Sequence, residues 1–268
     1  MIELIQITND PAFARRCDAL DGLRLFVDLE RLGKAERQSG RNTFLSTHQI
    51  SDVGKIKSQL RRSRLMVRVN PVHSGSREEV AAVLDGGADM LMLPMFTRAR
   101  ELQEFADLVA GKVPVVALLE TAGALASLAE WLGTPGLGEV YIGLNDLHVA
   151  LGRRFMFEPL AEGTVEAVGV QARERGIDFG FGGIARLDEG LLPGSDVLAE
   201  HLRLGSRCVI LSRTFHRSES REGFEEEVRA LRAAEAGLAL RTPQQALADA
   251  ARIAAVIGRI AAGMAGGA

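Results

Sequence analysis

The stretch Val115-Val116-Ala117-Leu118-Leu119-Glu120-Thr121 decides the fold class of this chain. It begins with a continuous apolar run that shows no alternation of apolar and polar residues. A strand covered on both faces has this pattern, whereas a strand with one solvent-exposed face alternates apolar and polar residues. Leu91-Met92-Leu93 has the same character. These runs predict buried strands of a parallel sheet.

Short apolar runs of this kind alternate with amphipathic helical stretches along most of the chain. The expected strands are residues 2–8, 23–30, 65–70, 90–95, 113–120, 139–145, 177–183 and 207–213, and the clearest helices are residues 11–20, 76–85, 97–109, 122–132, 163–175 and 196–204. Eight alternations without a long insertion favour an α/β fold, a (β/α)8 TIM barrel, over the rival doubly wound open sheet. Ser76 and Glu79 have the spacing of a capping box.

The C-terminal part departs from the alternation. Residues 222–240 form a charged amphipathic pattern, and Thr242-Pro243-Gln244 begins another helix with proline at its first position. Residues 250–262 are apolar on more than one helical face. We expect one barrel domain over residues 1–268, with a C-terminal helical extension at roughly residues 218–268. The extension either packs on a neighbouring subunit as well as on its own barrel, or only caps the barrel.

Composition narrows the class of protein. The chain has 268 residues, 47% of them hydrophobic, and a net charge of −3, so it can bury a large core but offers no basic groove for nucleic acid. Cys17 and Cys208 form neither a disulfide framework nor a zinc motif. The N-terminus lacks a signal-peptide pattern, and no apolar run reaches the ~20 residues of a membrane span. We expect a cytoplasmic protein with a small-molecule partner, and neither nucleic acid nor membrane as partner.

The active site of such a barrel lies at the carboxyl ends of the strands. Most of the expected strands end in charged or small polar residues, and a charge after an apolar run is costly when it is buried and unpaired. Several such groups at the same end of a barrel indicate a polar ligand, a metal ion or both. The residues expected to contact a substrate there are Asp28, Glu30, Arg68, Asn70, Thr121, Gly182 and Gly183.

Glu120 and Asp146 end neighbouring strands, the fifth and the sixth. Two carboxylates that leave positions for water and substrate suit Mg²⁺ or Mn²⁺. The alternative is that Asp146 caps the short helix that follows it. Arg68 ends the third strand, and its planar fork could hold a carboxylate and stabilise an enolate. The alternative for Arg68 is a structural ion pair with Asp28 or Glu30.

A glycine-rich run, Phe179-Gly180-Phe181-Gly182-Gly183, closes the seventh strand. Its glycines would let backbone N–H groups approach a phosphate, with help from Arg213. Tight strand–loop geometry explains the glycines equally well. The phosphate site and the purely structural role both stay open.

The long loop after the second strand carries Arg31, Lys34, Arg37 and Arg41. It is either a lid whose cations meet an anionic substrate or a solvated basic face. His48 follows this loop. It is a candidate acid/base residue, and the alternative is a surface histidine or the neighbour of a helix cap.

The strand-end motifs, taken in order and at their spacings, resemble the HpcH/HpaI aldolase and citrate lyase β-subunit superfamily over roughly residues 23–215. The motifs are Val27-Asp28-Leu29-Glu30, Val67-Arg68-Val69-Asn70, Asp85-Gly86-Gly87-Ala88-Asp89 running into Leu93-Pro94-Met95, Leu119-Glu120-Thr121, and Ile142-Gly143-Leu144-Asn145-Asp146-Leu147. Each motif alone is weak, and the ordered set is specific.

The resemblance implies a (β/α)8 barrel that uses a divalent metal and acts on 2-oxo acids or acyl-CoA thioesters. It places the metal ligands at Glu120 and Asp146 and the substrate-binding arginine at Arg68. An acidic residue that helps catalysis in the aldolase branch maps onto Asp85. Family members usually form trimers or hexamers, some with swapped C-terminal helices, so we expect a homo-oligomer.

The chain departs from the family pattern at the general base. The aldolase branch has a catalytic histidine directly after its Asp-x-Glu, and the lyase branch has an aspartate; here that position is Arg31. The motif around Asp146 also differs from the Pro-Ala-Asp-Leu of the aldolases and the Glu-Asp of the lyases. His48 and a metal-bound water are the candidates for the base.

We therefore expect a divalent-metal-dependent carbon–carbon lyase of the aldolase type. It would act on a 2-oxo acid such as pyruvate, or a related carboxylate, through a metal-stabilised enolate. A citrate-lyase-like acyl-CoA lyase and a phosphoenolpyruvate-type enzyme are the alternatives among enzymes. A catalytically inactive barrel used for binding or assembly is the alternative from another class.

Overall fold

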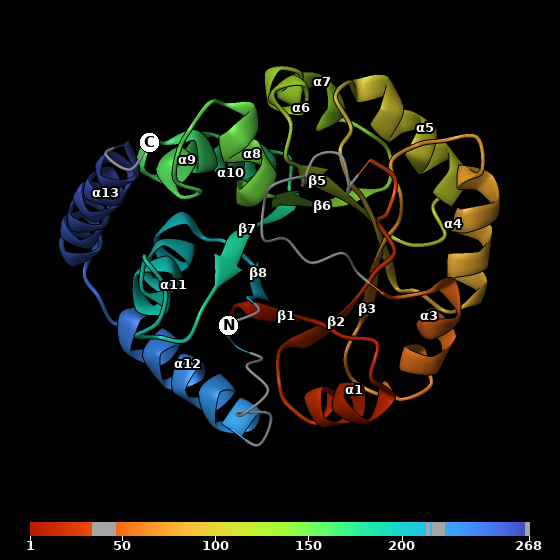
Figure 1. Ribbon diagram of the computed structural model, residues 1–268, viewed down its shortest axis with the longest axis horizontal. Helices are drawn as coiled ribbons and strands as arrows, with labels where there is room; N and C mark the ends of the chain where they lie inside the picture. The colour runs from red at the N-terminus through yellow and green to blue at the C-terminus, as the bar shows by residue number, and fades with distance from the viewer. Residues whose placement is uncertain (34–46, 213–214, 216–222, 266–268) are drawn as a thin grey trace. The chain divides into compact units, whose positions relative to one another are not determined.

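The computed structural model describes residues 1–33, 47–212, 215 and 223–265, and its eight strands form a closed barrel in the order β1 to β8 (Figure 1). Parallel pairing joins β2 to β3, β3 to β4, β4 to β5, and β7 to β8. This confirms the (β/α)8 TIM-barrel fold and excludes the open sheet. The strands are β1 (Glu3–Ile7), β2 (Leu23–Asp28), β3 (Leu65–Arg68), β4 (Met90–Leu93), β5 (Val115–Leu119), β6 (Leu137–Ile142), β7 (Asp178–Ile184) and β8 (Cys208–Leu211).

Helices alternate with the strands and then extend beyond them. They are α1 (Pro11–Asp18), α3 (Ile50–Lys57), α4 (Ser76–Asp85), α5 (Ala99–Val109), α6 (Ala122–Ala126), α7 (Leu128–Trp131), α8 (Leu144–Ala150), α9 (Glu158–Ala161), α10 (Thr164–Glu174), α11 (Gly194–Leu204), α12 (Phe224–Leu238) and α13 (Pro243–Ala265). The chain divides into two compact units. Ile5–Tyr141 is called the N-terminal unit below, and Met1–Leu4 with Ile142–Ala268 the C-terminal unit.

In the N-terminal unit, the apolar runs form strands because both of their faces are covered. All five residues of β5 are buried, as are all four of β4. Helix α5 buries Leu102, Phe105, Ala106 and Val109, which recur every three or four residues on one face. Helix α3 contacts β3 and α5 contacts β4, and Figure 1 shows α3, α4 and α5 outside β3. The strands therefore hold their carboxyl ends on a rigid, packed support.

Two expectations about local structure in the N-terminal unit were wrong. Ser76 and Glu79 do not form a capping box, because Gly75 is the N-cap of α4 and the Ser76 hydroxyl accepts the backbone N–H of His73. Residues 122–132 form two short helices, α6 and α7, instead of one. The sequence pattern also missed α3, in which Val53 and Ile56 are the buried apolar residues, too few for a clear helical period.

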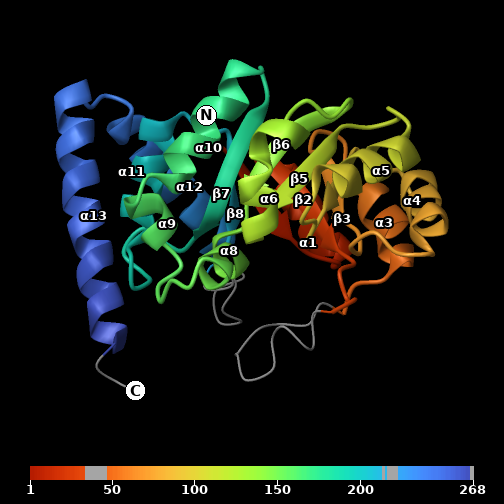
Figure 2. The same cartoon turned by 90° about the horizontal axis from the view of Figure 1, so that it is seen from above.

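In the C-terminal unit, α13 runs alongside α9 and α11 (Figure 2). Its Ile253 and Ile257 are buried against its own chain, whereas Leu247 and Met264 are exposed. The extra helix thus packs on helices of its own unit, and a contact with a neighbouring subunit stays a prediction. Within the part of the chain that the structure describes, no helix combines the length and hydrophobicity that a membrane crossing needs.

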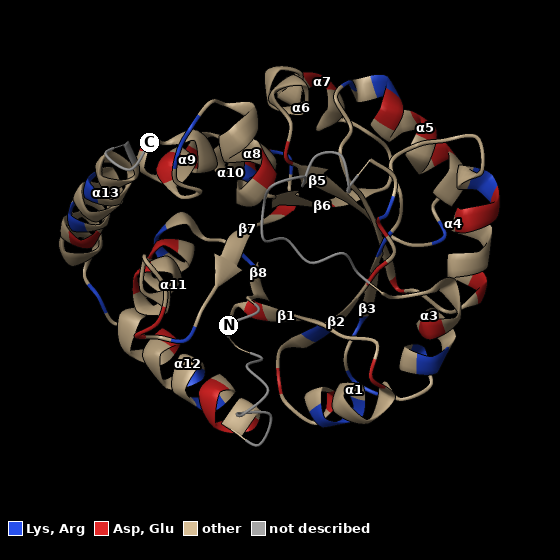
Figure 3. Ribbon diagram, viewed as in Figure 1, with Lys and Arg blue, Asp and Glu red and all other residues tan. Residues whose placement is uncertain are grey.

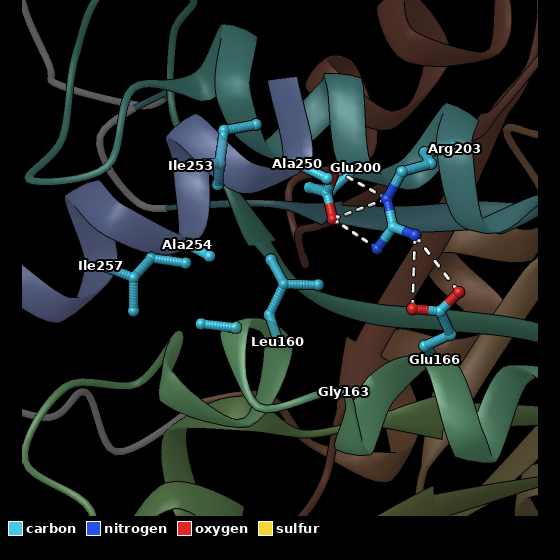
Figure 4. A pocket seen from close by; sticks show the side chains of 10 residues that line it. Leu160, Gly163, Glu166, Glu200, Arg203, Ala250, Ile253, Ala254 and Ile257 are labelled. Atoms are coloured by element: carbon cyan, nitrogen blue, oxygen red, sulfur yellow. Dashed lines mark hydrogen bonds and ion pairs between the residues drawn. The ribbon is translucent and has the colours of Figure 1, made fainter. Parts of the chain in front are cut away.

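A pocket of about 200 Å³ lies beside α13 in the same unit (Figure 4). Ile253 and Ile257 line one side, and the Arg203 guanidinium on the other side forms ion pairs with Glu200 and Glu166. None of the site residues that the sequence nominates lines this pocket. The candidate site therefore lies elsewhere.

Candidate functional site

Arg68, the last residue of β3, is the centre of a buried ion cluster in the N-terminal unit. Its Nε and Nη2 donate to the two carboxylate oxygens of Asp28 at 2.9 and 2.8 Å, and its Nη1 lies 3.2 Å from a Glu30 oxygen. The parallel register sets Asp28 of β2 beside Arg68. The ion pair named above as the alternative is therefore present. A guanidinium has five N–H groups, so the fork retains donors for a substrate, and that role stays a prediction.

Glu120 adds a third carboxylate to this cluster. Burial alone would lower the pKa of the Arg68 guanidinium, but the charges of Asp28, Glu30 and Glu120 outweigh burial and raise the pKa above its ordinary value. Glu120 is itself buried and follows β5 directly. Three carboxylates around one guanidinium leave excess negative charge at this end of the strands. Such a charge balance favours a cation.

The backbone of Met95 orients Glu120. Its N–H donates to Glu120 Oε1 at 3.0 Å. Met95 has a φ of 57°, in the left-handed region that a residue with a side chain rarely adopts. Strain of this kind costs on the order of 1–3 kcal/mol and clusters at functional sites. The contact of Met95 with Glu120 could not be predicted from the sequence, because nothing in Leu93-Pro94-Met95 indicates a positive φ.

Asn70 connects the ends of β2 and β3. Its Oδ1 accepts the backbone N–H groups of Arg31 and Leu32 at 2.8 and 3.0 Å, and its Nδ2 donates to Glu79 at 2.7 Å. The buried Glu79 also lies 3.1 Å from His73 Nε2. The network fixes the start of the loop after β2, so Asn70 is a positioning residue, and its contact with a substrate stays a prediction. Glu79 was missed because its spacing from Ser76 suggested a cap.

His48 is buried in this region, with 6% of its surface exposed, so the alternative of a surface histidine is wrong. The other alternative is confirmed, because His48 directly precedes Gln49, the N-cap of α3. Its Nδ1 accepts the backbone N–H of Asp28 at 3.1 Å, and its carbonyl accepts the Arg31 guanidinium at 2.8 Å. His48 lines a hollow of about 410 Å³ together with Arg31, Asn70 and Glu79. The structure thus brings His48 next to the residue that clamps Arg68.

Burial separates this cluster from the charges on the outside of the unit. Figure 3 shows acidic and basic positions interspersed along α4 and α5. Charges of both signs on exposed helix faces are ordinary features of folded proteins. Asp28, Glu30 and Glu120, by contrast, are all buried. Buried carboxylates need partners, so their convergence on Arg68 makes this cluster the candidate site.

Two other candidates in the N-terminal unit have different surroundings. Thr121 is the N-cap of α6; its hydroxyl accepts the Ala124 N–H at 3.0 Å and donates to the Phe96 carbonyl at 2.7 Å. Its contact with a substrate stays a prediction. Asp85 is exposed at the end of α4, four residues before Asp89, whose N–H bonds to Leu65 at the start of β3. The structure therefore does not bring Asp85 together with Arg68, which ends β3.

Asp146, the second expected metal ligand, belongs to the C-terminal unit. It lies in the first turn of α8, whose N-cap is Gly143, so the alternative of Asp146 as a cap is wrong. In the described ranges 1–33, 47–212, 215 and 223–265, no group of three or more His, Cys, Asp or Glu side chains could hold a metal ion. Two carboxylates completed by water and substrate would still suit Mg²⁺. The pairing of Glu120 with Asp146 stays a prediction.

The glycines of β7 have a structural reason. The register of β7 against β8 shifts between Gly180 and Gly183, and Gly182 has a φ of 59°. A Cβ at Gly182 would lie 3.1 Å from the Leu144 side chain. The bulge therefore requires glycine at 182, and a phosphate contact with Gly182 or Gly183 stays a prediction. The expected helpers Arg213, Lys34, Arg37 and Arg41 lie outside the described residues.

His201 of α11 stacks on Phe181 of β7, with ring centroids 3.8 Å apart and 4° between the ring planes. Burial lowers the pKa of His201 from 6.5 to about 3. The folded protein thus favours the neutral ring, and this contribution to stability is complete above pH 6.5 and lost as the pH falls toward 3. We expect wild type to lose about 2 kcal/mol more than His201→Phe between pH 7.5 and pH 5, at about 1.36 kcal/mol per pH unit.

Urea unfolding at both pH values measures this difference. Carboxylates titrate in both proteins, so their contribution cancels in the comparison. Identical pH dependence in the two proteins would contradict the assignment to His201.

Comparison with known proteins agrees with this architecture. A family model described as HpcH/HpaI aldolase/citrate lyase matches residues 25–177, which contain Arg68, Glu120 and Asp146. A (3S)-malyl-CoA thioesterase of Cereibacter sphaeroides (strain ATCC 17025 / ATH 2.4.3) is 33% identical over 139 residues, covering 51% of this chain and 46% of that protein. This chain thus spans less than half the length of the curated relatives it matches.

Two solved structures share the fold. An HpcH/HpaI aldolase from Desulfitobacterium hafniense DCB-2 superposes with a TM-score of 0.62 at 17% identity, covering 84% of this chain and 92% of that chain. An HpcH/HpaI aldolase/citrate lyase family protein from Burkholderia cenocepacia J2315 gives 0.63 at 17% identity, with coverages of 85% and 94%. At these identities the likeness concerns the fold alone.

Proposed function

This chain belongs to the HpcH/HpaI aldolase/citrate lyase family, and on that premise we propose that it is a divalent-metal-dependent carbon–carbon lyase of the aldolase type. Its substrate would be a 2-oxo acid built on a pyruvate-like unit, cleaved or formed through an enolate. The observation that carries the proposal is the convergence of three carboxylates on Arg68.

Glu120 and Asp146 are the residues that would hold the cation. The donor chemistry fits, because carboxylate oxygens are hard ligands and the Arg68 cluster carries excess negative charge. When bound, a divalent cation supplies Lewis-acid stabilisation of an enolate. The Met95 N–H would keep Glu120 oriented for that role.

Arg68 would bind the substrate and share the charge that develops during cleavage. In the cleavage direction, the carbon–carbon bond breaks, its electron pair passes to the 2-oxo group, and the hydroxyl proton leaves with a base. The remaining N–H donors of Arg68 suit the substrate carboxylate or the enolate oxygen. Asp28 and Glu30 would hold the guanidinium in place while that charge forms.

Deuterium exchange at a methyl group tests the proposal without knowledge of the aldehyde product. A lyase that forms the pyruvate enolate should exchange the methyl protons of pyruvate in D₂O, and NMR follows their loss in the presence of Mg²⁺. We expect Glu120→Gln to raise the Mg²⁺ concentration for half-maximal exchange about tenfold or more, because it removes a charged ligand. Glu130→Gln, an exposed change in α7, is the matched control. Metal-independent exchange that Glu120→Gln leaves undiminished would contradict the proposal.

A citrate-lyase-like acyl-CoA lyase is the second candidate, and the similarity to (3S)-malyl-CoA thioesterase favours it. Such an enzyme would form the enolate of a thioester instead of a 2-oxo acid. Acetyl-CoA in the same D₂O experiment separates the two candidates. Exchange of acetyl-CoA without exchange of pyruvate selects the acyl-CoA lyase, and exchange of neither favours an inactive barrel.

A further inference from the structure

The contact between His48 and Asp28 determines which ring nitrogen of His48 carries the proton. The backbone N–H of Asp28 donates to His48 Nδ1 at 3.1 Å, and both residues are buried. A nitrogen that accepts a hydrogen bond presents a lone pair, so it carries no proton. In the neutral imidazole the proton must then lie on Nε2. The contact selects one tautomer.

The Asp28 amide that selects the tautomer is held in place from several sides. The Asp28 carboxylate is clamped by Arg68 at 2.9 and 2.8 Å and also accepts the Glu30 N–H at 3.1 Å. The backbone of His48 is also held in place, because its carbonyl oxygen accepts a hydrogen bond from the Arg31 guanidinium. If Nδ1 of His48 were protonated, its N–H would face the backbone N–H of Asp28, so two donors would meet in a buried place. The geometry therefore opposes the imidazolium form.

We infer that His48 acts as a neutral hydrogen-bond donor through Nε2, and that it is not the general base. A general base at Nε2 would need a lone pair there, and the Asp28 amide puts the proton on that nitrogen instead. A neutral imidazole can serve as an electrophile toward an oxygen that gains negative charge. The inference deepens the proposed function and rests on it for the identity of that oxygen, in a 2-oxo acid substrate. His48 lines the hollow of about 410 Å³ together with Asn70, and the Asp28 residue whose N–H it accepts holds Arg68.

The tautomer can be measured without any substrate. Long-range ¹H–¹⁵N correlation on histidine-labelled protein at pH 7.5 distinguishes protonated from unprotonated ring nitrogens, and His48→Gln identifies the His48 signals by their loss. We expect a protonated Nε2 and an unprotonated Nδ1. An Nδ1–H tautomer or a doubly protonated ring would overturn the inference, whatever reaction the protein catalyses.

Exchange kinetics test the donor role. The amide side chain introduced by His48→Gln can still donate an N–H but cannot act as a base, whereas the leucine introduced by His48→Leu can do neither. We expect His48→Gln to stay within about tenfold of wild type and His48→Leu to lose about 10²–10³-fold, as for the loss of one oriented donor. Equal losses in the two variants would overturn the donor role. If wild type exchanges neither pyruvate nor acetyl-CoA, the proposed function fails, while the tautomer measurement still decides the rest.

Discussion

Arg68→Lys is expected to slow exchange or cleavage about 10²–10³-fold while the protein remains folded. Lysine keeps the positive charge among the carboxylates of Asp28, Glu30 and Glu120. The lysine has a single ammonium group in place of the planar guanidinium. It therefore cannot donate hydrogen bonds to both carboxylate oxygens of Asp28 and to a substrate at the same time. The rate of methyl exchange, compared with that of Arg61→Lys on the unit's surface, measures the effect.

Removing the charge separates the structural role of Arg68 from its catalytic role. Arg68→Met leaves three carboxylates without their common cation, and breaking a buried ion pair in this way costs about 3–5 kcal/mol. We expect urea unfolding to show that loss for Arg68→Met and a much smaller one for Arg68→Lys. A lysine variant with full activity would mean that Arg68 only holds Asp28 and Glu30 in place.

The strand ends of the candidate site could be predicted because burial leaves a local signature. Continuous apolar runs gave β4 and β5, and the polar residues that follow such runs gave Arg68 and Glu120. The barrel rule then placed them at one rim. The period of the apolar pattern and the positions where it stops carry this information.

The partners of those residues could not be predicted in the same way. Glu79 meets Asn70 and His73 through side-chain geometry that its position in a helix does not reveal. The Met95 N–H meets Glu120 because of one backbone angle, which the sequence does not specify for a methionine. His48 meets Asp28 across 20 residues of chain, and no local pattern pairs the two. Pairings of this kind depend on the folded chain as a whole.

Arg24 and Glu139 form the clearest pairing of this kind, 115 residues apart in the chain. Arg24 is the second residue of β2 and Glu139 the third of β6, and both lie within the N-terminal unit. Nη1 and Nη2 donate to the two carboxylate oxygens at 2.7 Å each, and the residues are 1% and 3% exposed. Because β2 and β6 are not neighbours in the strand order, the pair ties together distant parts of the sheet.

Arg24→Met is therefore expected to lower the free energy of unfolding by about 3–5 kcal/mol, since it leaves the Glu139 carboxylate buried and unpaired. Arg24→Met with Glu139→Leu should recover most of that loss, because two apolar residues need no partner. Arg153→Met is the matched control: its pair with Glu162 lies at 41% and 40% side-chain exposure, and its loss should stay below about 1 kcal/mol. Urea unfolding measures all three variants. If Arg24→Met loses no more than Arg153→Met, the buried pair does not hold the two strands together.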